Sequence, residues 1–180
     1  MCHILLQTPQ FFSILFKIDS DLAQIAHAQR CECGGLLHCG NYPRKPRGCT
    51  TAVQANEYNF RFSFCCSICR LRTTPMSIRF LGRRVYLSVL VVLLSTGLTR
   101  PTTAAIELAK TLGVPIKTLL RWRHWWQELF PSTSLWQAQC ARFMPPVQTS
   151  KLPISLLERF TGSDEMALTC LLKFLAPLSI

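Results

Sequence analysis

Two groups of closely spaced cysteines are the residues of this chain best suited to chemistry. The first is Cys31-Glu32-Cys33, followed by two glycines, and the second is the run Cys65-Cys66-Ser67-Ile68-Cys69. Two such turns, brought together by a hairpin, supply four thiolates in a tetrahedron around a zinc ion. We therefore predict a zinc site whose ligands are Cys31, Cys33, Cys66 and Cys69.

The spacing of these cysteines leaves alternatives open. One residue separates the first pair, where a zinc ribbon normally has two, and 32 residues separate Cys33 from Cys66, where about 15 to 20 are usual. Cys65 can replace Cys66, and His38 or Cys39 can join the site. The alternative to a metal site is a set of ordinary buried thiols.

Ten cysteines also bear on the compartment. The N-terminus has no basic residue before its apolar part, and Asp19 and Asp21 precede the small-residue sequence at 26–28, so a signal peptide is not expected. In a reducing compartment, clustered cysteines tend to bind metal rather than form disulfides. We predict a cytoplasmic protein.

The apolar run from Val85 to Leu98 is shorter than the roughly 20 residues of a membrane span, so we expect a buried helix there and no membrane contact.

The positive charge of the chain is concentrated. Twenty Lys and Arg against nine Asp and Glu give a net charge of +11, and residues 44–124 hold fourteen of these basic residues with only two acids, Glu57 and Glu107. A field of this kind favours a polyanion such as DNA or RNA. The alternatives are a solvated face or adhesion to an anionic membrane surface.

Several basic residues in this region are candidates for phosphate contact. Within 41–48, prolines hold the chain extended while cations project from it, which suits a phosphate contact or a minor-groove arm, or else an exposed, solvated loop. The candidates up to the apolar run are Arg44, Lys45, Arg47, Arg70, Arg72, Arg83 and Arg84.

Three helices are expected between residues 81 and 130. The first covers 85–96 and ends at Gly97, the second covers 104–112, and the third begins at Pro115 and continues to about Leu129. Ala109, four residues before Gly113, allows close helix contact, and Leu119, six residues after it, points into the core. This spacing is typical of a helix-turn-helix unit.

The third helix has two different faces. Its apolar face groups Leu119, Trp122, Trp126, Leu129 and Phe130, with Trp125 at the edge. Its polar face carries Lys117, Arg121, His124 and Gln127. In a major groove these four side chains can meet base edges or phosphates, so we predict that helix 115–129 contacts DNA. The alternative is a solvated polar face.

The order of these parts resembles a known family. The run from Cys66 to Pro75, then an apolar helix, then the stretch from Ala105 to Trp122, is similar to the N-terminal region of certain bacterial insertion-sequence transposases. The resemblance covers roughly residues 31–130 and implies a zinc ribbon followed by a helix-turn-helix. Residues 41–48 and 79–86 also resemble short proteins found around bacterial mobile elements. Residues 75–77 and the long ribbon loop depart from the family pattern.

The catalytic part of such transposases has no counterpart here. It uses three carboxylates that hold two metal ions on a separate domain, whereas the acids after residue 130 are only Glu158, Asp164 and Glu165. The chain also has no Gly-rich phosphate loop and no nucleophile elbow. We therefore predict that the protein is not an enzyme.

The predicted fold class is mainly α with a small β zinc-ribbon-like module (α+β). We divide the chain into an N-terminal helical segment at 1–30, the ribbon-like module at 31–80, the helix-turn-helix at 81–130 and a short helical tail at 131–180. Within the first segment we expect a helix from about Asp19 to Gln29, with Asp19 or Ser20 as its N-cap.

These parts lead to one functional hypothesis and two alternatives. The hypothesis is a zinc-stabilised, DNA-binding accessory or remnant of a transposase-like system. The first alternative is a zinc-stabilised interaction module that binds a protein partner or a second copy through 131–180. The second is an RNA-binding ribbon whose aromatic rings stack on bases. These rings are Tyr42, Tyr58, Phe60, Phe62 and Phe64. The alternation from Tyr58 to Phe64 is also typical of a half-buried strand.

Overall fold

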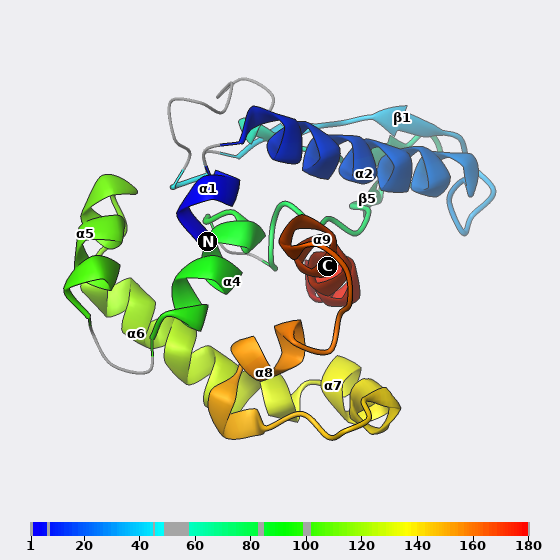
Figure 1. Ribbon diagram of the computed structural model, residues 1–180. Helices are drawn as coiled ribbons and strands as arrows, with labels where there is room; N and C mark the ends of the chain where they lie inside the picture. Colours follow the sequence, from blue (N-terminus) through cyan, green and yellow to red (C-terminus); the bar gives the residue numbers. More distant parts are fainter. Residues whose placement is uncertain are drawn as a thin grey trace.

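The chain is mostly helical and carries a small antiparallel sheet, so the α+β class is confirmed (Figure 1). The computed structural model describes residues 2–6, 8–44, 46–48, 58–82, 85–98 and 102–179, with the backbone alone at residues 2 and 3. The α-helices are α1 (Cys2–Leu6), α2 (Pro9–Ala28), α4 (Ser88–Thr96), α5 (Thr103–Thr111), α6 (Ile116–His124), α7 (Ser134–Gln139), α8 (Ile154–Leu157) and α9 (Asp164–Leu175). The strands are β1 (Leu37–Cys39), β2 (Tyr42–Pro43), β3 (Phe60–Arg61), β4 (Phe64–Cys66) and β5 (Arg72–Thr73).

The helix α2 is the longest element and starts much earlier than predicted. It begins at Pro9, which suits the first turn because proline lacks the N–H that would have no partner there. Phe11, Leu15, Asp19 and Ala23 are buried and follow one another at intervals of four residues, so they form one stripe along the helix. The predicted cap at Asp19 or Ser20 is wrong, because both residues lie inside the helix.

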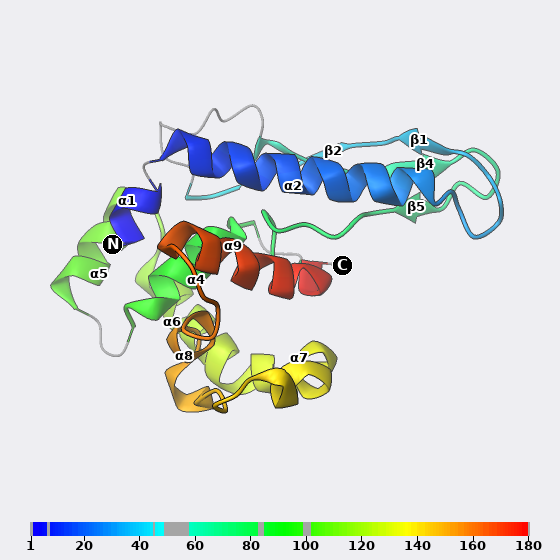
Figure 2. The same ribbon diagram turned by 45° about the vertical axis from the view of Figure 1, so that its right-hand side comes forward.

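The strands form two antiparallel sheets, and α2 runs alongside both of them (Figure 2). A three-stranded sheet has the order β1-β4-β5, and β2 pairs with β3 in a separate two-stranded sheet. Leu37 lies opposite Cys66 in the β1–β4 pairing, and Phe64 lies opposite Thr73 in the β4–β5 pairing. The first sheet lies at the C-terminal end of α2, far from α5 in both views.

The three helices expected between 81 and 130 are present. The predicted apolar helix is α4, and its residues from Ser88 to Ser95 are all buried. Thr102 caps α5 by accepting a hydrogen bond from the Ala105 N–H, at 3.3 Å. Between α5 and α6 the chain turns at Gly113, whose φ of +62° favours glycine. The Val114 N–H donates to the Ala109 carbonyl at 2.8 Å and closes this turn.

A change of helical winding alters the end of the third helix. From Trp125 to Leu129 the chain forms a π-helix, followed by a 3-10 turn from Phe130 to Ser132. A π turn inserts an extra residue and rotates the residues after it about the helix axis. As a result Leu129, predicted on the core face, is 49% exposed, while Phe130 is fully buried.

The larger of two hydrophobic cores joins the helices of the chain. Its buried members include Phe11 of α2, Leu90 of α4, Trp126 of the π-helix and Leu171 of α9. The tail at 131–180 consists of short helical pieces. Its 3-10 turns are Cys140–Arg142, Thr149–Lys151 and Ala176–Ser179, and only α9 exceeds two turns. Among the described residues, no helix combines the length and apolar character needed to cross a membrane.

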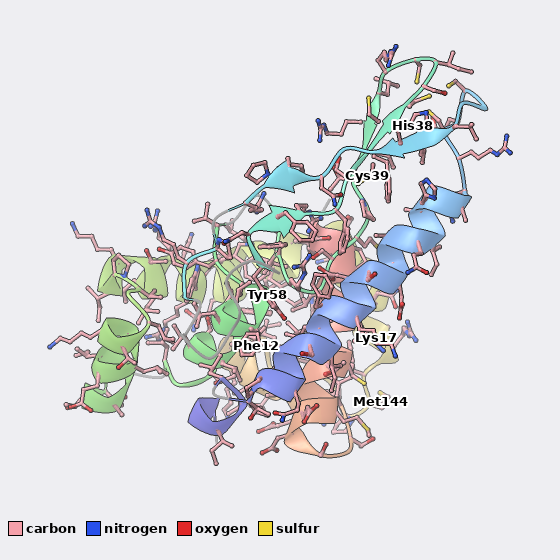
Figure 3. All side chains as sticks on the ribbon, turned by 90° about the horizontal axis from the view of Figure 1, so that it is seen from above. Phe12, Lys17, His38, Cys39, Tyr58 and Met144 are labelled. Atoms are coloured by element: carbon pink, nitrogen blue, oxygen red, sulfur yellow. The ribbon has the colours of Figure 1, made fainter. Side chains whose placement is uncertain are left out.

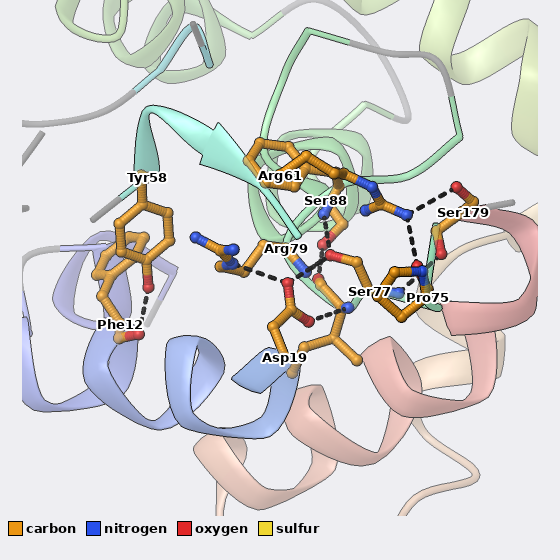
Figure 4. A network of polar contacts seen from close by, with 11 residues as sticks. Phe12, Asp19, Tyr58, Arg61, Pro75, Ser77, Arg79, Ser88 and Ser179 are labelled. Atoms are coloured by element: carbon orange, nitrogen blue, oxygen red, sulfur yellow. Dashed lines mark hydrogen bonds and ion pairs between the residues drawn. The ribbon is translucent and has the colours of Figure 1, made fainter. Parts of the chain in front are cut away.

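A buried ion pair between Asp19 and Arg79 connects α2 to the segment that follows β5 in sequence (Figure 4). The Asp19 carboxylate accepts from Arg79 Nε at 2.7 Å, from the Ile78 N–H at 2.7 Å and from the Ser77 hydroxyl at 2.5 Å. Asp19 and Arg79 are each 1% exposed. Beside them, Arg61 donates to the carbonyls of Pro75 and Ser179, each at 3.0 Å. The network therefore joins α2, the segment 75–79 and the last turn of the chain.

Three of the four aromatic side chains predicted to alternate along a strand, Tyr58, Phe60 and Phe62, surround this ion pair, whereas Phe64 lies in a separate small core. The guanidinium carbon of Arg79 lies between 4.9 and 5.7 Å from the centres of five rings, those of Phe16, Tyr58, Phe60, Phe62 and Phe80. Tyr58 also donates a hydrogen bond to the Phe12 carbonyl (Figure 4). Because the negative faces of aromatic rings attract a cation, these rings stabilise the buried guanidinium as well as cover it.

Candidate metal centre

Four thiols meet at the end of the sheet that lies near the C-terminus of α2. The sulfurs of Cys31, Cys33, Cys66 and Cys69 all lie within 4.8 Å of one another. Two sulfur pairs are closer, Cys31 to Cys69 at 3.5 Å and Cys33 to Cys66 at 3.4 Å. An ion bound to four sulfurs at about 2.3 Å in a tetrahedron separates them by about 3.8 Å. The observed separations bracket this value, so the four predicted ligands can hold a metal ion together.

The two cysteine turns reverse direction in the same way. Each is followed by a residue in the left-handed region, Gly34 with φ +82° after Cys33 and Arg70 with φ +60° after Cys69. The Cys31 carbonyl accepts from the Gly34 N–H at 2.8 Å. A side chain at Gly35 would not fit, because its Cβ would lie 2.5 Å from the Cys66 sulfur. Glycine at 35 therefore lets the first turn approach the second.

Backbone pairing and α2 hold these turns in place. The Cys66 N–H donates to the Leu71 carbonyl at 3.0 Å, and the Ser67 N–H donates to the Leu36 carbonyl at 2.9 Å. A small second core of Ala23, Leu37, Phe64 and Cys66 seals the sheet against α2. The His27 ring nitrogen Nε2 lies 2.8 Å from the Leu37 carbonyl oxygen and connects the end of α2 to β1. This helical brace was not predicted from the sequence.

The neighbouring candidate ligands lie outside the cluster. The Cys65 thiol hydrogen-bonds to the Arg70 carbonyl at 3.5 Å, on the other side of its strand from the buried Cys66. His38 and Cys39 lie on β1, where Figure 3 labels them, opposite Cys65 and Phe64 respectively. Among the described residues, the metal-like cluster contains Cys66 and neither Cys65, His38 nor Cys39.

The cluster changes the acidity of its thiols. Burial raises the pKa of Cys66, but the backbone N–H groups of Ile68 and Cys69 and the Cys33 thiol outweigh it, and the pKa falls from 9.0 to about 6. The Leu71 amide lowers the pKa of Cys69, but burial and the other thiols outweigh it and raise that pKa to about 12. The pKa of Cys31 is raised as well. An incoming metal therefore finds one thiolate at neutral pH and must displace protons from other ligands.

This acidity gives a pH-dependent prediction for the metal-free protein. The folded pKa of Cys66, about 6, lies below its ordinary value of 9.0, so the Cys66 thiolate stabilises the metal-free fold above pH 9, and this contribution is lost as the pH falls towards 6. Thiolate absorbance near 240 nm, measured under reducing conditions, should show its first step with a midpoint near pH 6. Cys66→Ser should remove that step. A first step near pH 9 in the unmodified chain would contradict the arrangement.

Two of the arginines predicted to contact phosphate, the half-buried Arg44 and the exposed Arg72, are held by hydrogen bonds within the protein. Arg44 is half-buried, donates to the Gly82 carbonyl at 3.0 Å and lies over the Phe80 ring. Arg72 donates to the Gly40 carbonyl at 2.7 Å and to the Ser63 hydroxyl at 3.1 Å. Arg47 and Arg70 are exposed. Lys45, Arg83 and Arg84 lie outside the described residues.

The polar face of α6 is exposed as predicted. Lys117, Arg121 and His124 are exposed, while Leu119 and Trp122 on the opposite side are 1% and 3% exposed and anchor the helix. Arg121 donates to the Thr118 hydroxyl at 3.0 Å, which steadies its side chain. Gln127, placed in the π-helix, is half-buried. Figures 1 and 2 show α6 and the three-stranded sheet at opposite ends of the molecule, so these side chains and Arg70 do not form one surface.

The two alternative functions require either exposed aromatic rings that stack on RNA bases or an exposed apolar surface on residues 131–180. Tyr58 and Phe64 are buried, and Phe60 and Phe62 are half-buried around Arg79, so these rings do not form a stacking platform for bases. In the tail, most apolar side chains enter the main core. Met144, labelled in Figure 3, is the most exposed of the large apolar residues there, at 81%.

Comparison with known proteins gives no further assignment of the site. No family model, no curated protein and no solved structure matches the chain.

Proposed function

We propose that the protein is a zinc-stabilised, DNA-binding accessory protein of the transposase-like kind, without catalytic activity. In this proposal one zinc ion fixes the two cysteine turns, and the exposed face of α6 enters the major groove. The observation that supports nucleic-acid binding best is the sidedness of α6, where three exposed polar or basic side chains stand opposite two buried anchors.

Zinc is the metal that suits the cysteine cluster best. Four thiolates in a tetrahedron are typical of zinc or of iron–sulfur centres. Zinc tolerates the uneven sulfur separations of 3.4 to 4.8 Å because its filled d shell imposes no geometric preference. With all four positions filled by protein, the ion would stabilise the fold and would not bind a substrate.

Two features support duplex DNA as the partner. The turn at Gly113 and the buried Ala109 and Leu119 agree with the spacing of a helix-turn-helix, whose second helix is the one that enters the groove. The resemblance to transposase N-terminal regions, which is a likeness of sequence order, favours the same partner. Because the metal centre lies at the far end of the molecule, Arg70 would contact phosphates separately from α6 rather than extend its surface.

A salt titration tests this function. Binding of the zinc-loaded protein to a labelled, mixed-sequence DNA duplex should weaken steeply as salt rises, because each phosphate contact releases counterions. Lys117→Ala and Arg121→Ala should each weaken binding severalfold and reduce the slope of log K against log salt by about one.

The matched control is Lys173→Ala, which removes an exposed cation from α9. It should leave both affinity and salt slope almost unchanged. Equal losses in all three variants would show only a diffuse effect of net charge and would contradict a role for α6. Binding to RNA with the same variants losing affinity would keep α6 as the interface and change the partner.

A further inference from the structure

An apolar cavity lies between α1, α4, α8 and α9, in a part of the molecule that the proposed function does not use. Its volume is about 230 Å³. Figures 1 and 2 show α9 next to α4, with α8 below them. The apolar side chains that line it are Leu5, Leu93, Ile154, Leu157, Ala167 and Leu168. A dry cavity of about 150 Å³ is already large enough to bind benzene, so this one can hold a ligand of six or seven carbon atoms.

Among the described residues, only two polar side chains reach this cavity, and one of them is charged. Thr96 lines it from the end of α4, and Asp164 lines it from the first turn of α9. Within the described parts of the chain, the single salt bridge joins Asp19 to Arg79, so no basic side chain pairs with the Asp164 carboxylate. The cavity therefore combines an apolar interior with one negative group at an exposed position.

We infer that this cavity is a binding site for a small primary amine with an alkyl or aryl body. The hydrocarbon would replace water against the leucine and isoleucine side chains, which drives binding in proportion to the apolar area that is covered. The ammonium group would lie against the Asp164 carboxylate, whereas the Thr96 hydroxyl is engaged by the Leu93 carbonyl, to which it donates at 2.7 Å. A carboxylate ligand of the same length would be repelled by the same group.

The test compares three probes of equal length on the zinc-loaded full chain: n-hexylamine, hexan-1-ol and hexanoate. Binding is followed by shifts of backbone amide signals in NMR titrations at pH 7. Hexylamine should bind saturably and about fivefold more tightly than hexan-1-ol, which is the upper range for a solvent-accessible ion pair. Hexanoate should bind most weakly, and the shifted signals should come from α4, α8 and α9.

Three variants separate the effect of the Asp164 charge from that of the apolar cavity. Asp164→Asn should reduce the affinity for hexylamine to that for hexan-1-ol, whereas Glu165→Gln, the adjacent acid outside the cavity, should leave it unchanged. Ala167→Leu, which fills the space, should weaken hexylamine and hexan-1-ol together.

No saturable binding of hexylamine at about 10 mM, a concentration at which even weak ligands are detected, would overturn the inference. Hexanoate binding as tightly as hexylamine, or Asp164→Asn without effect, would overturn it as well. The DNA-binding surface proposed on α6 does not include these residues, so a failure here leaves the proposed function unaffected.

Discussion

Replacing Cys66 with serine should reduce bound zinc from one ion per chain to none and unfold the end of the molecule formed by β1, β4 and β5. The Cys66 sulfur is fully buried, lies 3.4 Å from that of Cys33 and receives the Ile68 N–H. Zinc binding in small four-ligand modules contributes on the order of 10 kcal/mol to folding. The measurement is metal content by mass spectrometry of the native protein, followed by thermal unfolding with and without a chelator.

The control for this prediction is the neighbouring thiol. Cys65→Ser changes the adjacent residue to the same side chain, but its sulfur contacts the Arg70 carbonyl and not the other thiols. It should retain one zinc per chain and nearly unchanged stability. If Cys65→Ser lost the metal and Cys66→Ser kept it, the ligand set would be wrong even though a zinc site exists.

Replacing Asp19 with alanine should destabilise the whole protein by about 3–5 kcal/mol, because it leaves the Arg79 guanidinium buried without its counter-charge. The carboxylate also accepts from the Ser77 hydroxyl and the Ile78 N–H, and these donors would lose their acceptor. The change should appear as a lower midpoint of urea unfolding. Asp21→Ala, an exposed acid of the same helix, should change the unfolding free energy by less than about 0.5 kcal/mol.

A double variant separates the charge from the space it fills. Asp19→Leu with Arg79→Met removes both charges and keeps apolar volume among the five surrounding rings. Replacing both members of a buried pair costs much less than removing one. We expect the double variant to be more stable than Asp19→Ala. Equal losses from Asp19→Ala and Asp21→Ala would show that the pair does not hold α2 to the segment 75–79.

The sequence predicted which four cysteines cluster, but it predicted their surroundings poorly. Residue type and short-range spacing identified the four cysteines, since turns of three or four residues are local. The 32 residues between the two pairs looked too long for a ribbon. The structure explains part of that length, because the connection leaves β1, runs through β2 and returns through β3 before β4. Such a detour depends on pairing between distant residues, which local spacing does not reveal.

The error at Asp19 has a different cause. An acid before an apolar helix is a typical cap, and the helical prediction began there for that reason. The overlooked signal was periodicity, because Phe11, Leu15, Asp19 and Ala23 follow at intervals of four, which places the acid in a buried stripe. A charged residue in such a stripe requires a partner, and Arg79 stands in the apolar run from Ile78 to Leu81.

The count of basic residues between 44 and 124 also overestimated the positive charge that is available at the surface. Arg61 and Arg79 belong to the basic region but are buried, and Arg44 and Arg72 are held by backbone carbonyls. On the third helix, periodicity correctly placed Lys117 and Arg121 outside and Trp122 inside. It failed at Leu129 because the π turn breaks the 3.6-residue repeat on which it depends.

X-ray absorption at the zinc edge of the purified protein measures the metal and its ligands together, and is therefore decisive for the cysteine cluster. We predict one zinc per chain, surrounded by four sulfur atoms at about 2.3 Å and by no nitrogen or oxygen. Absence of zinc from protein purified with its thiols reduced, or a shell that contains a histidine nitrogen in place of a sulfur, would contradict the zinc centre proposed for Cys31, Cys33, Cys66 and Cys69.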